Sequence, residues 1–237
     1  MPTDRPRALL LDLDDTLLHN DMEDFLPTYF GALMESVAHL MPPEEFFRAL
    51  HYATQRMMVS TDLSRSNEEV FWHEFEPSLP MPRQELEPVL AQFYEEQFGA
   101  LRGQTEPVEG APELVEAAKA AGWKVAIATN PVFPLRAMEH RIAWAGLPLD
   151  ALDYVTAYEN MRSTKPHPSY FSQIVGDLGV APGDAVMAGN HLTNDLVGAA
   201  EVGLRTFWVD SYPIADAEFE PDARGDLIAL RRWLFGD

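Results

Sequence analysis

ALLLDLDDTL, residues 8–17, joins an unbroken apolar run to a cluster of three aspartates. A continuous apolar run is typical of a strand that is buried on both faces of a parallel sheet. Asp12, Asp14 and Asp15 follow the point where this strand would end. Ligands of open parallel sheets bind beyond the carboxyl ends of the strands. The segment therefore predicts the first strand of an α/β sheet, with acidic side chains at the edge where a ligand would bind.

The sequence beyond Gly103 alternates short apolar runs with segments of helical periodicity. Strands that alternate with helices in this way are typical of a parallel sheet covered by helices on both faces. The expected strands are 125–129, 154–158, 185–189 and 206–209, and the expected helices are 112–121, 134–145, one after Pro168, one after Thr193 and 225–234. The acidic segment 215–226 is expected to be a surface loop.

Residues 21–102 show helical periodicity without a convincing strand. About four helices are expected here, separated by proline-rich or polar breaks. The fold predicted for the whole chain is α/β, with a doubly wound (Rossmann-like) parallel sheet core formed by residues 1–17 and 107–237 and an all-helical domain inserted at residues 18–106. The aromatic and methionine side chains of the insertion are expected to pack inside it. They include Phe46, Phe47, Met57, Met58, Phe71, Trp72 and Phe75.

The composition excludes several classes of function. The 237 residues include 17 basic and 38 acidic ones, which gives a net charge of −21, and no cysteine. A chain this acidic is repelled by nucleic acid and by anionic membrane surfaces, so we expect neither as a partner. The lack of cysteine excludes disulfides, thiolate metal sites and cysteine nucleophiles. Because no apolar run approaches the roughly 20 residues of a membrane span and the first residues do not resemble a signal peptide, we expect a cytoplasmic protein.

Polar side chains follow four of the expected strands, and the carboxyl ends of parallel strands share one edge of the sheet. These side chains are Asp12 and Asp14, Thr129 and Asn130, Lys165, and the segment from Asn190 to Asp195. On a continuing strand, Asp12 and Asp14 would face the same side. Two carboxylates so close together favour a hard divalent cation such as Mg²⁺ between or beside them. The sequence therefore predicts an acidic, metal-binding crevice.

Each of these residues also has an ordinary structural explanation. Aspartates at a strand end form turns and helix caps, although this accounts for one aspartate better than for three in four residues. Thr129 and Asn130 equally suit a turn or a cap, Lys165 suits a solvated loop, and Asp195 suits the first turn of a helix. It is the order of these residues after successive strands that favours a shared site.

Four motifs in this order resemble those of the haloacid dehalogenase superfamily, a large group of mostly phosphate-cleaving hydrolases. Asp12-x-Asp14-x-Thr16 resembles the first motif, Thr129 the second and Lys165 the third, while Gly189 through Asp195 resembles the fourth. The resemblance covers essentially the whole α/β core. The helical insertion after the first motif resembles the cap domain of that family.

The resemblance implies a role for each residue of the first three motifs. Asp12 would be the nucleophile that forms an aspartyl-phosphate, and Asp14 would be the general acid and base. Thr129 and the backbone N–H of Asn130 would hold phosphate oxygens, and Lys165 would neutralise the charge on the phosphoryl group.

The resemblance also implies a Mg²⁺ cofactor, held by Asp12, by the backbone carbonyl of Asp14, and by Asn190 and Asp195 of the fourth motif. The fourth motif departs from the family pattern, because phosphatases of the family usually carry an acid directly after the glycine and this chain has Asn190 there. An amide can offer Mg²⁺ a neutral oxygen but no charge, so more of the coordination could fall to Asp195. His191, the next residue, reads as an ordinary loop histidine.

The function predicted is a hydrolase, namely a Mg²⁺-dependent phosphatase acting on a small phosphorylated metabolite. Asp14 argues against halide displacement, because a departing halide needs no proton. Two alternatives remain at this point: a phosphotransferase or phosphomutase, and a weakly active protein of the same fold that binds a metabolite. Polar residues that could meet the substrate, mostly on the insertion, are His19, Asn20, Arg48, Arg56, Arg65, Asn67 and Arg136.

Overall fold

The computed structural model describes residues 7–236 and contains a sheet of six parallel strands in the order β5-β4-β1-β6-β7-β8. The strands are β1 (Ala8–Leu11), β4 (Lys124–Ile127), β5 (Tyr154–Val155), β6 (Ala185–Gly189), β7 (Arg205–Val209) and β8 (Ala223–Gly225). The chain builds outward from β1 in one direction through β4 and β5, and in the other through β6, β7 and β8. This confirms the predicted doubly wound sheet, with a switch point at β1.

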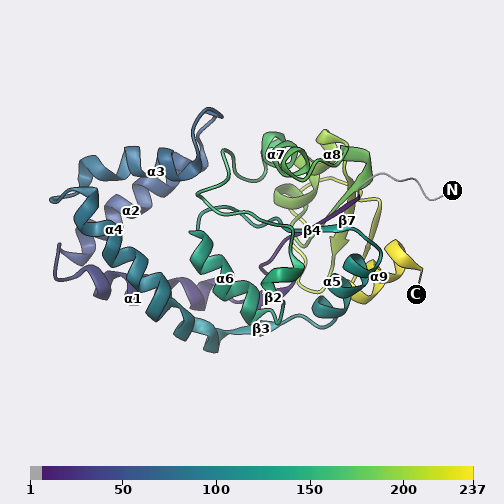
Figure 1. Cartoon of the computed structure of the whole chain (residues 1–237), viewed down its shortest axis with the longest axis horizontal. Helices are drawn as coiled ribbons and strands as arrows, with labels where there is room; N and C mark the ends of the chain where they lie inside the picture. Colours follow the sequence, from purple (N-terminus) through teal and green to yellow (C-terminus); the bar gives the residue numbers. More distant parts are fainter. Residues whose placement is uncertain (1–6, 237) are drawn as a thin grey trace.

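Helices cover both faces of this sheet, and β1 contributes side chains to both (Figure 1). Leu9 and Leu11 pack in a cluster with side chains of α5, α6 and α9, whereas Ala8 and Leu10 pack with those of α7 and α8. The five helices are α5 (Ala111–Ala120), α6 (Leu135–Trp144), α7 (Pro168–Leu178), α8 (Gly198–Val202) and α9 (Leu227–Phe235). Burial on both faces explains why the first strand is apolar at every position.

Three elements differ from the sequence expectation. The segment 215–226 is not a loop throughout, because β8 forms within it where the Asp222 carboxylate accepts a 2.8 Å hydrogen bond from the backbone N–H of Thr206. The strand expected at 154–158 is only two residues long. The helix expected after Thr193 begins instead as a π-helical turn over residues 192–197 before α8.

The insertion is helical, as predicted, and lies at the left of Figure 1. It contains α1 (Met22–Val37), α2 (Pro43–Met58), α3 (Asn67–Phe75) and α4 (Arg83–Gln92), followed by a π-helical turn at 93–97 and a 3₁₀ segment at 98–104. The helix α3 begins with a capping box, in which Ser66 and Glu69 each satisfy a backbone N–H of the other. No helix within residues 7–236 combines the length and the apolar character that crossing a membrane demands.

Two short strands that the sequence did not reveal connect the insertion to the core. β2 (Leu18–Asn20) and β3 (Thr105–Pro107) pair antiparallel where the chain enters and leaves the helices. The proposed division into domains at residues 18 and 106 falls within or beside this pair and remains a prediction.

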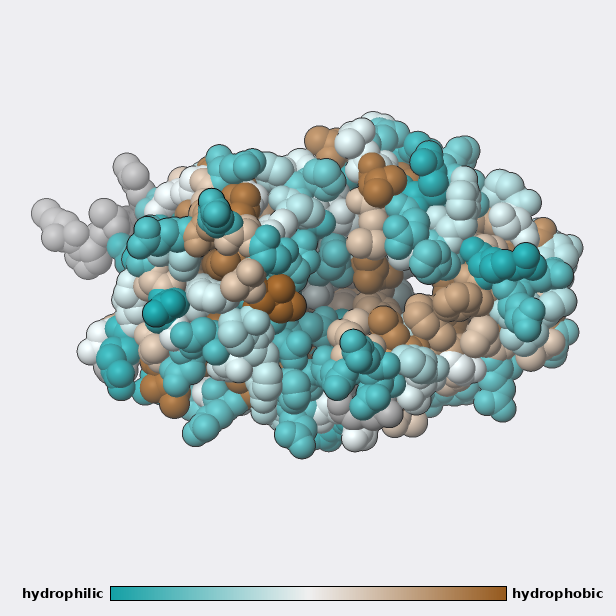
Figure 2. Space-filling model, turned by 180° about the vertical axis from the view of Figure 1, so that it is seen from behind, coloured by the Kyte–Doolittle hydropathy of each residue, from teal (hydrophilic) through white to brown (hydrophobic). Residues whose placement is uncertain are grey.

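The insertion and the core share one hydrophobic cluster. Phe98 stacks on Trp144 of α6 with ring centroids 5.4 Å apart, and Phe25 meets the same indole edge-on at 6.3 Å. The expected apolar stripe of the insertion is buried at Phe46, Met57, Phe71, Trp72 and Phe75 and half-buried at Phe47 and Met58. Seen from the other side, the surface is hollowed between the insertion and the core (Figure 2).

Candidate active site

Asp12 lies directly beyond the end of β1, where its backbone N–H donates to the carbonyl of Ala188 at 2.9 Å. Its carboxylate is buried and has a partner on each oxygen. Lys165 Nζ lies 2.7 Å from Oδ1, and the Thr16 hydroxyl donates to Oδ2 at 3.1 Å. A buried carboxylate therefore faces a buried ammonium group at the carboxyl edge of the sheet.

Lys165 also contacts a second carboxylate, because its Nζ lies 2.6 Å from Asp195 Oδ1. The other oxygen of Asp195 accepts a hydrogen bond of 2.9 Å from the backbone N–H of His191. Gly189 makes this arrangement possible, since a Cβ at that position would lie 2.2 Å from Asp195 Oδ2. The first, third and fourth sequence motifs thus meet at one lysine.

Burial and neighbouring charges shift the pKa values of Asp12 and Lys165. Burial first, and then the nearby Asp195 carboxylate, raise the pKa of Asp12 to about 7, although Lys165 counteracts part of the rise. For Lys165, burial by itself lowers the pKa, but the carboxylates of Asp12 and Asp195 outweigh it and hold the pKa above its ordinary value. Lys165 is therefore a permanent cation at neutral pH.

Asp14 is held by a different set of partners from those of Asp12. The strand ends at Leu11, and Asp15 adopts a positive φ of 56°. Asp12 and Asp14 therefore do not lie on a continuing strand, contrary to the expectation from the sequence. Arg141 and Asn20 both donate to Asp14 Oδ1, the latter at 3.1 Å.

Thr129 and Asn130 follow β4, the strand that neighbours β1. The Ala128 N–H donates to the Leu11 carbonyl at 2.7 Å, which keeps the ends of the two strands side by side. Thr129 is buried, and its carbonyl accepts hydrogen bonds from Tyr170 at 2.7 Å and Thr156 at 2.8 Å. Asn130 Oδ1 is buried without a hydrogen-bond partner within residues 7–236. All four predicted motifs lie at the ends of the adjacent strands β4, β1 and β6 or in direct contact with them.

Asn190 begins the fourth motif and is also buried. Its amide nitrogen donates to the Tyr212 carbonyl at 2.7 Å, and its own backbone carbonyl accepts from Trp208 Nε1 at 2.8 Å. Because the amide nitrogen is bonded to the protein, the side-chain oxygen is the end that could serve as a metal ligand.

The donor atoms fit Mg²⁺ on the basis of their chemistry. Across residues 7–236, no three His, Asp or Glu side chains are grouped so that they could hold a metal ion by themselves. The possible oxygen ligands at this edge are the carboxylates of Asp12 and Asp195, the Asp14 carbonyl and the Asn190 amide oxygen. Both carboxylates already have a protein partner on each oxygen, so a bound cation would share or replace one of those contacts. Mg²⁺ is usually held in this way, by one or two carboxylates with substrate phosphate and water completing its shell.

The polar residues that the sequence proposed for substrate contact have other partners. Arg65 pairs with Asp62 at 2.8 Å, and Arg136 pairs with Glu95 at 2.7 Å, both partly exposed. Arg56 lies 3.6 Å from Glu74, Arg48 donates to its own helix, and Asn67 donates to the Ser163 carbonyl at 3.3 Å.

His19 and Asn20, in contrast, lie next to the first motif. His19 contacts Asp15 at 2.8 Å and stacks on Tyr212 at 4.0 Å, while Asn20 bonds Asp14. His191 contacts Asp216 at 3.3 Å and caps the following turn, as expected of a loop residue.

The sequence reasoning missed Arg141. It singled out Arg136 on α6, yet the residue of that helix that reaches the site is Arg141, which is 1% exposed. A signal was available: Arg141 follows Ala137 by four residues and Met138 by three, which places it on the buried face of α6.

Comparisons with known proteins agree with this geometry. A phosphoserine phosphatase of Thermus thermophilus is 29% identical over 93% of this chain and 96% of its own length. A glyceraldehyde 3-phosphate phosphatase of Pyrococcus furiosus is 30% identical, but that match covers 31% of this chain and only 30% of the relative. Among solved structures, a 2-haloacid dehalogenase of Pseudomonas syringae has a TM-score of 0.65 at 20% identity over 97% of this chain and 98% of that one, which shows a common fold.

The sequence model of haloacid dehalogenase-like hydrolases matches residues 6–203, which include all four motifs and the helical insertion. This chain belongs to the haloacid dehalogenase-like hydrolase family.

Proposed function

We propose that this protein is a Mg²⁺-dependent phosphatase that hydrolyses the phosphomonoester of a small metabolite through an aspartyl-phosphate at Asp12. The observation that carries the proposal is the buried Asp12 carboxylate beside Lys165, with a second carboxylate, that of Asp14, two residues further on. A buried, oriented carboxylate next to a fixed cation is suited to attack an electrophilic phosphorus atom.

In the first step, the Asp12 carboxylate forms a bond to phosphorus while the bond from phosphorus to the ester oxygen breaks. The electron pair of that bond stays on the departing oxygen, which takes a proton from Asp14 and leaves as an alcohol. Asp14 is then a carboxylate, and the phosphoryl group is bonded to Asp12.

In the second step, Asp14 accepts a proton from water as the water oxygen attacks the same phosphorus atom. The acyl phosphate bond breaks, inorganic phosphate is released, and Asp12 returns to its carboxylate form while Asp14 is again protonated. The sum of both steps is a phosphomonoester plus water giving an alcohol plus phosphate.

The remaining residues of the site would hold charge in place during both steps. Lys165 is a buried cation that can balance charge on the transferring oxygens, and Thr129 with the Asn130 N–H lies on the neighbouring strand end. Asp195 positions Lys165 through the 2.6 Å contact. Water-excluded donors of this kind stabilise developing charge strongly because they need no reorganisation.

Mg²⁺ would be held by Asp12, the Asp14 carbonyl, Asn190 and Asp195, and either carboxylate would share or exchange its contact with Lys165 to bind the ion. When bound, the ion shields the repulsion between an anionic phosphate and an anionic nucleophile. The protein's part is to orient the Asp12 carboxylate through Lys165 on one oxygen and Thr16 on the other.

Two observations favour phosphate esters over halogenated acids as substrates. Asp14 can protonate an oxygen leaving group, which a halide does not require. Two relatives with a sequence match are named as phosphatases of phosphoserine and of glyceraldehyde 3-phosphate, both small phosphorylated metabolites. The dehalogenase shares the fold at an identity too low to transfer its reaction.

The test is the release of product from 4-nitrophenyl phosphate and from a panel of small phosphomonoesters that includes phosphoserine. Each is measured with Mg²⁺, with EDTA, and with the variants Asp12→Asn and Asp184→Asn. Asp184 is the matched control because it precedes β6 at the opposite edge of the sheet.

Activity that requires Mg²⁺ and Asp12, and that the Asp184 variant retains, would support the proposal. Activity that persists in Asp12→Asn would overturn the covalent mechanism. If the wild type is silent on every ester, Asn190→Asp supplies the acid usual in the family, and continued silence in that variant would overturn the phosphatase proposal.

A further inference from the structure

Arg141 is a buried arginine that none of the four motifs includes. It lies in the last turn of α6, is 1% exposed, and its Nη2 contacts Asp14 Oδ1. Its guanidinium carbon lies 5.2 Å from the ring centroid of Phe133, which packs against the planar group. A cation so far from water needs a charged partner, and Asp14 is the carboxylate that the guanidinium reaches.

A second buried group converges on the same oxygen. Asn20 ends β2, has no exposed surface, and donates its side-chain N–H to Asp14 Oδ1 at 3.1 Å. Both fixed donors therefore bind Oδ1. In the part of the chain that the structure describes, no protein atom is hydrogen-bonded to Oδ2, and the Asp14 side chain keeps 27% of its surface exposed.

We propose that Arg141 is a positioning residue for Asp14 and that, with Asn20, it fixes Oδ1 so that Oδ2 is the oxygen that exchanges protons with the leaving group and with water. This inference rests on the proposed phosphatase function and adds an atom and two residues to it. Asp12 and Asp14 are then held by separate cations, with Lys165 contacting the nucleophile and Arg141 contacting the acid.

A purely structural ion pair explains the contact of Arg141 and Asn20 with Asp14 Oδ1 less well than a positioning role does. The negative end of the α6 dipole accounts for a basic residue in the last turn, but a side chain in water satisfies it equally. Arg136 of the same helix shows the ordinary alternative, since it is 41% exposed and pairs with Glu95 and Glu139 at the surface. Burial of Arg141 and its convergence with Asn20 on one oxygen are the additional features.

The experiment compares substrates that need the proton with substrates that do not. 4-Nitrophenolate leaves without protonation, whereas phenoxide and alkoxide leaving groups depend on the general acid. The value of kcat/KM reports the step in which the leaving group departs. For Arg141→Met we expect kcat/KM on phenyl phosphate to fall about 10²-fold, at the lower end of general-acid contributions, and on 4-nitrophenyl phosphate to fall at least tenfold less.

Four further variants separate positioning from a general loss of structure. Arg136→Met, the matched control on α6, should lower kcat/KM for both esters by the same small factor. Asp14→Asn should show the same selective loss as Arg141→Met, and the double variant should lose little more than Asp14→Asn alone, because both changes remove one function. Arg141→Lys keeps the charge and should recover part of the kcat/KM on phenyl phosphate that Arg141→Met loses.

Three results would overturn the inference while leaving the phosphatase function intact. One is an equal loss on both esters in Arg141→Met, and another is an additive double variant. If Arg141→Met does not fold, Asn20→Ala replaces it, and its loss in kcat/KM should be smaller but again larger on phenyl phosphate than on 4-nitrophenyl phosphate. An equal loss on both esters in Asn20→Ala is the third result. Failure of the proposed function looks different, because the wild type would then be inactive or independent of Asp12.

Discussion

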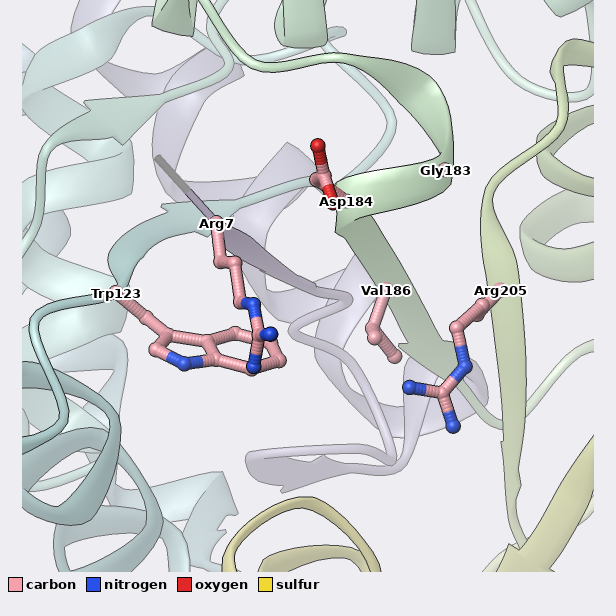
Figure 3. A pocket seen from close by; sticks show the side chains of 6 residues that line it. All are labelled: Arg7, Trp123, Gly183, Asp184, Val186 and Arg205. Carbon is pink, nitrogen blue, oxygen red and sulfur yellow. The ribbon is translucent and has the colours of Figure 1, made fainter. Parts of the chain in front are cut away.

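The two edges of the sheet carry similar charged residues, which are buried and paired at one edge and exposed at the other. At the carboxyl edge, Asp12, Lys165 and Asp195 are buried and bonded to one another. At the amino edge, a cavity of about 140 Å³ is lined by residues that precede or begin the same strands: Arg7, Trp123, Gly183, Asp184, Val186 and Arg205. Figure 3 shows the Asp184 carboxylate turned away from both guanidinium groups.

The difference lies in what the charged groups contact. Arg205 is exposed and stacks over the Trp233 ring at 4.1 Å, and Arg7 lies over Trp123 at 5.6 Å. Exposed charges of this kind are solvated and interact weakly. At the other edge, Asp12 and Asp195 share the buried Lys165 cation, so the pKa values of Asp12 and Lys165 shift and removal of one of these charges is costly. The reactivity of charged side chains at the carboxyl edge therefore depends on their burial and their contacts with one another, and charge by itself is not sufficient.

Replacing the lysine at the carboxyl edge should have the largest effect. In Lys165→Met, two buried carboxylates lose their shared cation, so we expect the free energy of unfolding to fall by about 3–5 kcal/mol. The catalytic constant should fall about 10²–10³-fold, as when a charge-stabilising donor is removed. Urea denaturation and phosphate release measure the two effects.

The control for that variant lies at the other edge. Lys124 begins β4, and its Nζ donates to the Leu178 carbonyl at 2.5 Å. Lys124→Met should cost about 1 kcal/mol and leave kcat unchanged, because one hydrogen bond is lost and no buried charge is exposed. Equal losses in the two lysine variants would contradict the comparison.

The buried Asp12 carboxylate should lower the free energy of unfolding when it is ionised. The pKa of Asp12 is raised from 3.8 to about 7, so between these values the folded state binds more protons than the unfolded state and stability falls as pH rises. Asp12→Asn removes this cost. We expect its free energy of unfolding to exceed that of the wild type by up to about 4 kcal/mol at pH 8, since each pKa unit corresponds to about 1.4 kcal/mol. The two proteins should be nearly equal at pH 4.

Denaturation of both proteins across pH 4–8, without metal, measures this difference. A variant that is less stable than the wild type at pH 8 would show that ionised Asp12 contributes stability through Lys165 and does not cost it.

A smaller effect is expected from a methyl group at the carboxyl edge. Gly189→Ala would place a Cβ 2.2 Å from Asp195 Oδ2 and 2.7 Å from Asp195 Cβ, so Asp195 must move away from Lys165. We expect a loss of about 1–3 kcal/mol in stability, typical of overpacking, with a fall in kcat. At the amino edge, Gly183→Ala has no atom within 4 Å of the new Cβ and should change neither. A Gly189 variant with normal kcat would show that Asp195 does not position Lys165.

Sequence reasoning could place the carboxyl edge because the signal there is local. An apolar strand followed at once by Asp12, and a glycine followed six residues later by Asp195, require no knowledge of the tertiary structure. Parallel strands then bring these ends together by topology alone. The contacts of Lys165 with both acids are the consequence of that order.

The role of Arg141 and the pairing of β2 with β3 could not be predicted from the sequence, for different reasons. A three-residue strand has too few residues for a periodic pattern, so the pairing of His19 with Glu106 could not be read locally. Arg136 and Arg141 are five residues apart, about 140° around the helix, so one faces Glu95 at the surface while the other points inward. Proximity to Thr129 in sequence favoured Arg136, whereas burial selected Arg141.

The smallest effect should come from the amino edge itself. Arg205→Ala removes a cation that stacks on Trp233 at an exposed site, which is worth about 0.5–1 kcal/mol. Activity should stay within about twofold of the wild type, because exposed charges at this distance from the chemistry are screened by salt. Arg205→Lys keeps the charge and should recover part of the stability, since an ammonium group stacks less well than a planar guanidinium group. Thermal denaturation and kcat/KM measured on the same preparations test both. A tenfold change in kcat/KM would mean that the two edges are coupled through β6 and β7, and that burial alone does not separate the reactive edge from the inert one.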